Sequence, residues 1–231
     1  MRRDDKKLVW DFPTRAFHWL LACALVGSWI TAEAGFEWTE THFLLGYVSL
    51  GLILFRLIWG CVGTTYARFS HFVKPPQALL AYLPKLFSRT PPRDIGHNPI
   101  GGWSVVLMLI LVAIQVGTGL FLSDDIFYAG PYNAIVSSDL AGRLASIHHT
   151  NFLILQIIVA VHIIAVIWYT VGKKTNLIGP MITGKKAGID AEQAIPKSRL
   201  AVALLVGLVV AVIVVALVQL APPPSIDDYS F

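Results

Sequence analysis

The sequence predicts an all-α, polytopic membrane protein with five transmembrane helices, and two observations lead to this fold class. Of the 231 residues, 55% are hydrophobic and only 14% are charged, whereas a soluble domain carries about a quarter charged residues. The apolar residues also gather in five runs that are near the length of about 20 residues needed to cross a bilayer. These runs are residues 16–32, 43–62, 103–122, 152–171 and 200–220.

Basic and acidic residues alternate from one connection between these runs to the next. The basic residues concentrate in the N-terminal segment, between the second and third runs, and between the fourth and fifth. The other connections and the C-terminal tail are acidic, with Arg143 as their single basic residue. Lys and Arg favour the cytoplasmic side of a membrane, so we expect a bacterial inner-membrane protein with a cytoplasmic N-terminus and a periplasmic C-terminus. The net charge of +4 reports this topology and does not indicate nucleic-acid binding.

The first half of the chain contains two expected transmembrane helices and a Pro-broken connection. Pro13 suits the start of a helix, where its missing N–H costs nothing. The preceding residues lack the pattern of a cleavable signal peptide, so we expect the first helix to be retained. A short outer loop makes the first two helices antiparallel neighbours. The inner connection between the second and third runs includes a Pro-broken stretch at residues 74–94, with a short amphipathic piece that is expected to lie along the inner membrane surface.

The second half contains three expected helices, an outer loop and a polar linker. The outer loop at residues 124–146 is long enough to form a cap, and residues 175–198 read as an irregular linker. The fifth run has no ionisable side chain, which suits a lipid-facing addition or a docking surface. Cys23 and Cys61 lie inside the first two runs and are interpreted as small core residues. A CxxCH motif is missing, which excludes covalent attachment of a c-type haem.

Five histidines lie at or within the apolar runs, where ionisable side chains are scarce and usually functional. They are His18, His42, His148, His149 and His162. His71 and His97 fall in the inner connection instead, where we expect ordinary solvated histidines.

The spacing of these histidines predicts two pairs at different depths. His148 and His162 are 14 residues apart, which places them within about 40° of one helix face and about 21 Å apart along the axis. His149 lies on the side opposite His162. His18 is near the inner end of the first helix, and His42 is at the outer start of the second. Depth therefore pairs His42 with His148 near the outer surface, and His18 with His162 nearer the inner one.

Two pairs of imidazoles stacked across a membrane suit two b-type haems, each with two axial histidines. The predicted fold is then a four-helix dihaem bundle at residues 1–187, followed by a linker, a fifth C-terminal transmembrane helix and an acidic periplasmic tail at 188–231. Zinc would need a third and fourth ligand at the same depth. A proton or metal transporter that uses the histidines directly is the distant alternative, although the apolar runs contain no Asp or Glu.

Two further residues are candidates for contact with a haem. Arg56 follows His42 by 14 residues, so it shares that helix face at the depth of the inner pair, where a haem propionate is a suitable anion. A snorkelling arginine is the alternative interpretation. Gly46 lies one turn after His42 and would let a flat macrocycle approach the backbone, as would Gly117 and Gly119. Glycines also serve plain helix packing.

Several motifs resemble the bacterial cytochrome b561 and nickel–iron hydrogenase b-type cytochrome family. The resemblance covers about residues 8–187, which is four of the five expected helices. The motifs are "WDFPTRAFHW", "HFLLGYVSLGLILFRLIWG", "GTGLF", "IHHTNFLILQIIVAVHIIAVIWY" and "NLIGPMITGKK".

This resemblance implies that His18, His42, His148 and His162 are the ligands of two haem b groups. It also implies electron transfer between the quinone pool, ubiquinone or menaquinone, and a redox partner such as a periplasmic cytochrome or an oxidoreductase subunit. The alternative within electron transfer is a membrane-anchoring cytochrome b subunit of a hydrogenase-like complex. Quinol oxidoreductase activity and a homodimer stay open.

Overall fold

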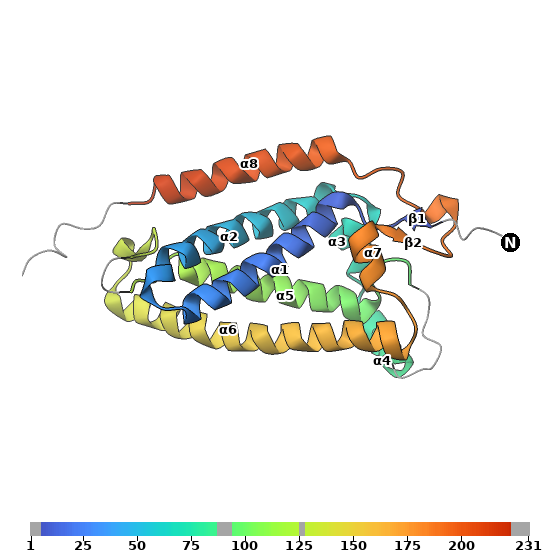
Figure 1. Ribbon diagram of the computed structural model, residues 1–231, viewed down its shortest axis with the longest axis horizontal. Coiled ribbons are helices and arrows are strands. Elements are labelled where there is room, and N and C mark those ends of the chain that lie inside the picture. The colour runs from blue at the N-terminus through green and yellow to red at the C-terminus, as the bar shows by residue number, and fades with distance from the viewer. Residues whose placement is uncertain (1–5, 87–93, 125–127, 223–231) are drawn as a thin grey trace, which may run out of the picture. The chain divides into compact units, whose positions relative to one another are not determined.

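A computed structural model describes residues 6–86, 94–124 and 128–222 (Figure 1). Five of its helices are long and apolar enough to cross a membrane. They are α1 (Phe12–Glu33), α2 (Thr39–Val62), α5 (Pro99–Gly119), α6 (Ser138–Ile167) and α8 (Leu200–Gln219). Each contains one of the five predicted runs or nearly all of it. The predicted acidic tail from residue 223 onward lies outside the described residues, as do Arg2, Arg3, Arg89 and Arg93.

Short elements connect the long helices. The amphipathic piece expected in the inner connection is α4 (Pro76–Leu86), which follows the single turn of α3 (Phe69–Phe72). A two-stranded antiparallel sheet pairs β1 (Lys7–Leu8) with β2 (Lys185–Lys186), directly after α7 (Ile178–Thr183). This sheet was not predictable from the sequence, because two-residue strands have no readable hydrophobic period.

The linker before α8 is packed rather than irregular. Its Ile195 is 4% exposed and forms a hydrophobic cluster with Val9, Trp10 and Tyr66. The Ile195 N–H donates to the carbonyl of Leu8 at 2.9 Å, and the Tyr66 hydroxyl donates to the carbonyl of Gln193 at 2.6 Å. The apolar residues that looked isolated in the sequence therefore attach the linker to the N-terminal segment.

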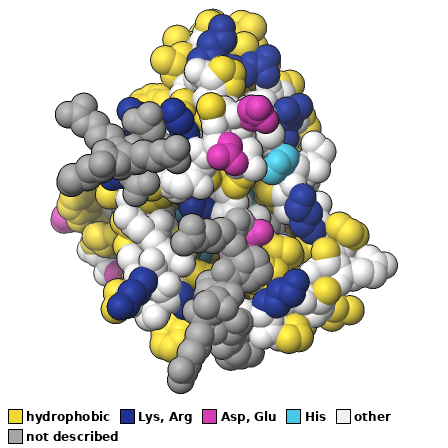
Figure 2. All heavy atoms as spheres, turned by 90° about the vertical axis from the view of Figure 1, so that its right-hand side faces the viewer, with side chains coloured by type: hydrophobic (Ala, Val, Ile, Leu, Met, Phe, Trp, Pro, Cys, Tyr) yellow, Lys and Arg dark blue, Asp and Glu magenta, His cyan; other side chains and the backbone are white. Residues whose placement is uncertain are grey.

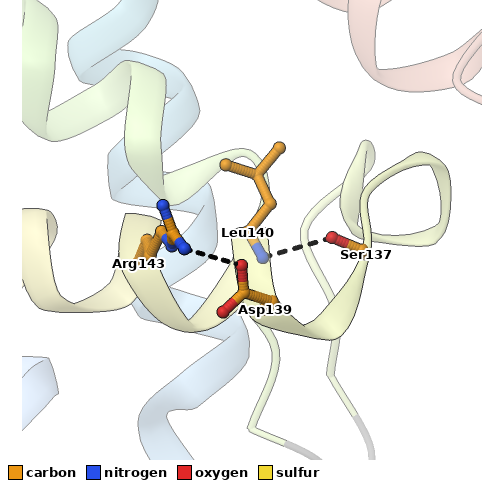
Figure 3. A network of polar contacts seen from close by, with 4 residues as sticks. All are labelled: Ser137, Asp139, Leu140 and Arg143. Carbon is orange, nitrogen blue, oxygen red and sulfur yellow. Dashed lines mark hydrogen bonds and ion pairs between the residues drawn. The ribbon is translucent and has the colours of Figure 1, made fainter.

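The fourth transmembrane helix begins at Ser138, well before the predicted start at residue 152. Ser137 acts as its N-cap, since the Ser137 hydroxyl oxygen accepts from the Leu140 N–H at 3.3 Å. Asp139 and Arg143 form an exposed ion pair of 3.1 Å across the first turn (Figure 3). About four helical turns, residues 138–151, thus precede the predicted apolar run, and the predicted outer loop is correspondingly shorter. At its other end α6 passes into a π-helical turn, Trp168–Gly172.

Buried polar groups fix the start of α1. Asp11 is 1% exposed and caps the helix, its Oδ1 accepting from the Thr14 N–H at 2.6 Å. Its other carboxylate oxygen accepts from the hydroxyl of Thr64, and the indole N–H of Trp59 donates to the Thr14 hydroxyl at 3.2 Å. The "WDFPT" segment is thereby held against the end of α2.

The chain divides into two compact units, and each of the five long helices contributes residues to both. Unit 1 comprises Met1–Trp19, Phe55–Met108 and Ile157–Val206. Unit 2 comprises Leu20–Leu54, Leu109–Gln156 and Gly207–Phe231. The domain boundary at residues 187 and 188 stays a prediction.

Many large apolar side chains on the long helices are exposed, as a membrane protein requires. On α8, Leu204 is 74% exposed and Leu208 is 63% exposed. Such extended apolar surfaces would be unfavourable in water, whereas hydrocarbon chains solvate them. The five-helix membrane fold predicted from the sequence is therefore confirmed.

Candidate functional site

One pair of histidine rings lies in unit 1. His18 on α1 and His162 on α6 have ring centroids 6.4 Å apart, with an angle of 54° between the ring planes. The His18 Nδ1 atom is buried and has no hydrogen-bond partner among the described residues. A buried polar atom without a partner is costly, so this pair is a candidate for contact with a group beyond the polypeptide.

A second pair of histidine rings lies in unit 2. His42 on α2 and His148 on α6 also have ring centroids 6.4 Å apart, with an interplanar angle of 67°. The Nδ1 atoms of both rings make hydrogen bonds. His42 Nδ1 lies 2.9 Å from the carbonyl oxygen of Ser28, and His148 Nδ1 lies 3.0 Å from the hydroxyl oxygen of Thr118.

These hydrogen bonds define which nitrogen of each unit 2 imidazole carries the proton. A carbonyl oxygen only accepts, so His42 Nδ1 must donate to Ser28. The Thr118 hydroxyl has one proton, which it can donate to the carbonyl of Ile114 at 2.7 Å, leaving its oxygen to accept from His148 Nδ1. In its neutral form each ring then presents an unprotonated Nε2, which is the form in which imidazole binds a metal.

The separation of the rings can be compared with the needs of an iron between two imidazoles. A first-row transition metal lies about 2 Å from each ligating imidazole nitrogen, which would place the two ring centroids roughly 6 Å apart. Both histidine pairs match this separation. Neither pair has a third or fourth ligand, since the described residues contain no group of three or more His, Cys, Asp or Glu that could hold a metal ion. Two imidazoles per site could hold a haem iron but not a closed tetrahedral zinc ion.

His149 belongs to neither of the two histidine pairs. Its side chain is exposed, and its ring is 6.0 Å from that of His148 in an edge-to-face contact. His71 is also exposed, in agreement with the expectation of a solvated histidine.

His97 contradicts that expectation. Its ring lies 4.8 Å from the rings of both Trp10 and Phe72, and its Nδ1 is buried without a partner among the described residues. Burial, together with the positive charge of Arg56, lowers the pKa of His97 to about 3, so the ring is neutral at physiological pH. The sequence analysis assigned His97 to solvent because neither aromatic neighbour is close to it in the sequence.

Arg56 is buried in unit 1 and forms no ion pair among the described residues. Its side chain is 3% exposed, and its guanidinium carbon lies 4.8 Å from the ring centroid of Phe69 and 5.5 Å from that of Phe72. One guanidinium nitrogen, Nη1, has no hydrogen-bond partner in the described part of the chain. Such burial excludes a snorkelling side chain, and it leaves a cation that an anionic group would stabilise.

The glycines of unit 2 differ in the space beside them. A Cβ atom added at Gly46 or Gly117 would meet nothing within 4 Å, so both face open space. At Gly119 the added atom would lie 3.4 Å from the ring of His148. Gly46 and Gly117 are therefore compatible with a flat group beside the backbone, whereas Gly119 packs against the histidine itself.

Comparison with known proteins identifies the family. The family model described as prokaryotic cytochrome b561 matches residues 9–184. The chain belongs to the prokaryotic cytochrome b561 family. Membership of this family makes it a multi-pass membrane protein and a haem b-type cytochrome of electron transport.

The relatives of this cytochrome b561 family member carry more specific names. It is 24% identical over 219 residues to a probable Ni/Fe-hydrogenase B-type cytochrome subunit of Rhizobium leguminosarum bv. viciae, covering 80% of this chain and 90% of the relative. The protein of the same name in Azotobacter vinelandii is equally similar, with the same coverage. That of Cupriavidus necator is 22% identical, covering 79% of this chain and 87% of the relative. No solved structure matches the chain.

Several residues around the cytochrome's histidines escaped the sequence analysis. Ser28 and Thr118 contact the unit 2 imidazoles, and Phe69 and Phe72 cover Arg56. Thr118 lies within the "GTGLF" motif, so a polar residue inside a transmembrane run was an available signal. Ser28, Phe69 and Phe72 gave no such signal, because Ser28 acts through its backbone carbonyl and aromatic residues are common throughout the chain.

Proposed function

We propose that this cytochrome carries two haem b groups and transfers electrons between the quinone pool and a partner oxidoreductase subunit. The observation that carries the proposal is the repeated separation of 6.4 Å between the histidine rings of each pair. His18 and His162 would hold one haem iron, and His42 and His148 the other. Haem b held by two imidazoles supplies one-electron exchange. The substrate would be ubiquinone or menaquinone.

The surrounding residues orient these ligands. The Ser28 carbonyl and the Thr118 hydroxyl hold Nδ1 of His42 and His148, which directs both Nε2 atoms to the position of the iron. The open space at Gly46 leaves room for the macrocycle edge. In unit 1 the unpartnered Nη1 of Arg56 would bind a propionate.

The test of this function is haem quantification with a reduced-minus-oxidised visible spectrum. Pyridine haemochrome analysis of the purified full chain should give two non-covalent b haems per polypeptide. A content of one would contradict the second site. A colourless protein that conducts protons or metal ions would favour the transporter instead.

Thr118→Val should raise the midpoint potential of the haem bound by His42 and His148. A hydrogen bond accepted from Nδ1–H makes an imidazole a more basic ligand, which stabilises oxidised iron. A net hydrogen bond is worth about 0.5–1.5 kcal/mol, or about 20–60 mV for a one-electron couple. Redox titration of the α-bands measures the shift. Thr150→Val on the exposed side of α6 is the matched control. If the midpoint potentials of both haems were unchanged in Thr118→Val, the hydrogen bond between Thr118 and His148 would have no effect on an iron ligand.

Arg56→Leu should lower the midpoint potential of the other haem while leaving most of it bound. A cation close to a propionate favours the reduced state, and hydrogen bonds to charged groups contribute about 1.5–3 kcal/mol, or about 60–130 mV. The same redox titration measures the effect. Arg143→Leu, which removes an exposed arginine in unit 2, should change neither potential. If the midpoint potentials of Arg56→Leu and of the unchanged protein were equal, Arg56 would not contact a haem propionate.

The distribution of basic residues along the chain supports an inner-membrane topology. All Lys and Arg residues except Arg143 fall in unit 1, and Arg143 pairs with Asp139. Figure 2 shows Lys and Arg side chains spread over the face at the β1–β2 end of the molecule. Because basic residues favour the cytoplasmic side, the N-terminus would be cytoplasmic and the C-terminus periplasmic.

The names of the relatives favour a subunit of an oxidoreductase complex, hydrogenase-like, over a free-standing quinol oxidoreductase. The similarity extends over nearly their full length. A free-standing enzyme that donates to a soluble periplasmic cytochrome is the second candidate. Purification in a mild detergent separates the two, since a subunit should co-purify with its partner and a free-standing enzyme should not.

A further inference from the structure

A pocket in unit 1 lies where two transmembrane helices end. It has a volume of about 280 Å³ and is lined by the chain that leaves α2 after Val62 and by the chain that enters α8 at Leu200. Both helices are long and apolar enough to cross the membrane. Their ends therefore lie near the boundary between hydrocarbon and water, where phospholipid headgroups are found.

Three cations line this pocket, namely Arg68, Lys197 and Arg199. The side chains of Arg68 and Lys197 are exposed and have no hydrogen-bond or ion-pair partner in the described part of the chain. Thr64 in the pocket wall donates its hydroxyl proton to the carboxylate of Asp11, which is buried and also accepts from the Thr14 N–H. The charge of the three cations is thus not neutralised by an ion pair.

Arg199 is fixed in place at the pocket. Its Nη1 donates to the carbonyl oxygens of Val62 at 2.8 Å and Gly63 at 3.4 Å, which caps the end of α2. Its backbone has a φ of 51°, in the left-handed region that residues with a Cβ rarely adopt. Arginine has five N–H donors, so the remaining donors are free to bind a ligand. Arg199 also immediately precedes α8, whose N-terminus adds partial positive charge.

We propose that this pocket binds the phosphate of an acidic phospholipid headgroup. Arginine and lysine are the side chains that bind phosphate oxygens, and basic pockets beside transmembrane helices on the cytoplasmic side suit such headgroups. The exposed apolar side chains of Leu57 on α2 and Leu204 on α8 offer a surface for the acyl chains, which free phosphate lacks. The lipid would join the end of α2 to the start of α8. This inference does not depend on the haem assignments.

The test is native mass spectrometry of the full holoprotein in a neutral detergent. Phosphatidylglycerol should bind at a saturable site, and phosphatidylcholine should bind much more weakly. Each basic residue near a membrane surface contributes about fivefold to the attraction of acidic lipid, so the double variant Arg68→Gln/Lys197→Gln should bind phosphatidylglycerol about 25-fold more weakly. Arg68→Lys keeps the charge and should retain most of the affinity.

One control distinguishes a specific lipid site from general attraction of acidic lipids to basic residues. A second distinguishes a lipid headgroup from inorganic phosphate. Lys85→Gln removes an exposed cation from α4, outside the pocket, and should leave the saturable binding unchanged. If Lys85→Gln weakened the binding of phosphatidylglycerol as much as the double variant does, the lipid would be attracted by basic residues in general, and the proposal of a specific site in this pocket would be wrong. Inorganic phosphate should not displace phosphatidylglycerol. Displacement at equal concentration would show a free-phosphate site and overturn the lipid assignment.

Discussion

His42→Ala and His148→Ala should each remove the same component of the α-band, and His18→Ala and His162→Ala should each remove the other. Each pair of rings is separated by the distance expected for two imidazoles on one iron. Losing either ligand leaves a five-coordinate iron, so the affected haem should be lost or become high-spin. Haem content should fall from two per chain toward one. Redox-resolved spectra of the four variants measure which component disappears.

His149→Ala and His71→Ala are the matched controls for this experiment. Both side chains are exposed, and both variants should retain the two spectral components. If His18→Ala affected the same component as His148→Ala, the assignment of the ligands to pairs would be wrong. The contact of His149 with His148 makes its variant the more stringent control, since a loss there would show that edge-to-face packing also orients the ligand.

The helices and the common face of His148 and His162 were predictable because both follow from local periodicity, whereas the pairing of histidines from different helices followed from their expected depth in the membrane. A run of about 20 apolar residues defines a transmembrane helix wherever it occurs. The 14-residue spacing of His148 and His162 fixes their common face by helix geometry alone. The start of α6 was not predictable from hydropathy, because its first two turns are polar and depend on the cap at Ser137.

The surroundings of the site were less predictable, because they depend on contacts between distant segments. The ring of His97 packs against Trp10 from the N-terminal segment and Phe72 from α3. The aromatic rings that cover Arg56 come from the connection after α2. The packing of Ile195 likewise required the fold, since a single isoleucine in a polar segment has no periodic partner.

Gly130→Ala should destabilise unit 2 and release the haem that we propose is bound by His42 and His148 before the proposed second haem. A Cβ atom at this position would lie 2.4 Å from the carbonyl oxygen of Leu120 and 2.8 Å from that of Gly119. These are backbone atoms at the end of α5, so the clash cannot be relieved by rotating a side chain. The Gly130 N–H also donates to the Leu122 carbonyl at 2.6 Å. Overpacking of this kind costs about 1–3 kcal/mol.

The effect reaches the proposed haem site because the same turn carries Thr118, which accepts the hydrogen bond from His148. A displaced end of α5 should lengthen that bond and loosen the ligand. The measurements are the thermal unfolding midpoint and the haem content after mild heating. Gly142→Ala is the matched control, since its Cβ would meet nothing within 4 Å on α6 and alanine stabilises a helix interior by about 0.5–1 kcal/mol. Equal behaviour of the two variants would mean that the loop can shift without disturbing α5, and that His148 is oriented independently of it.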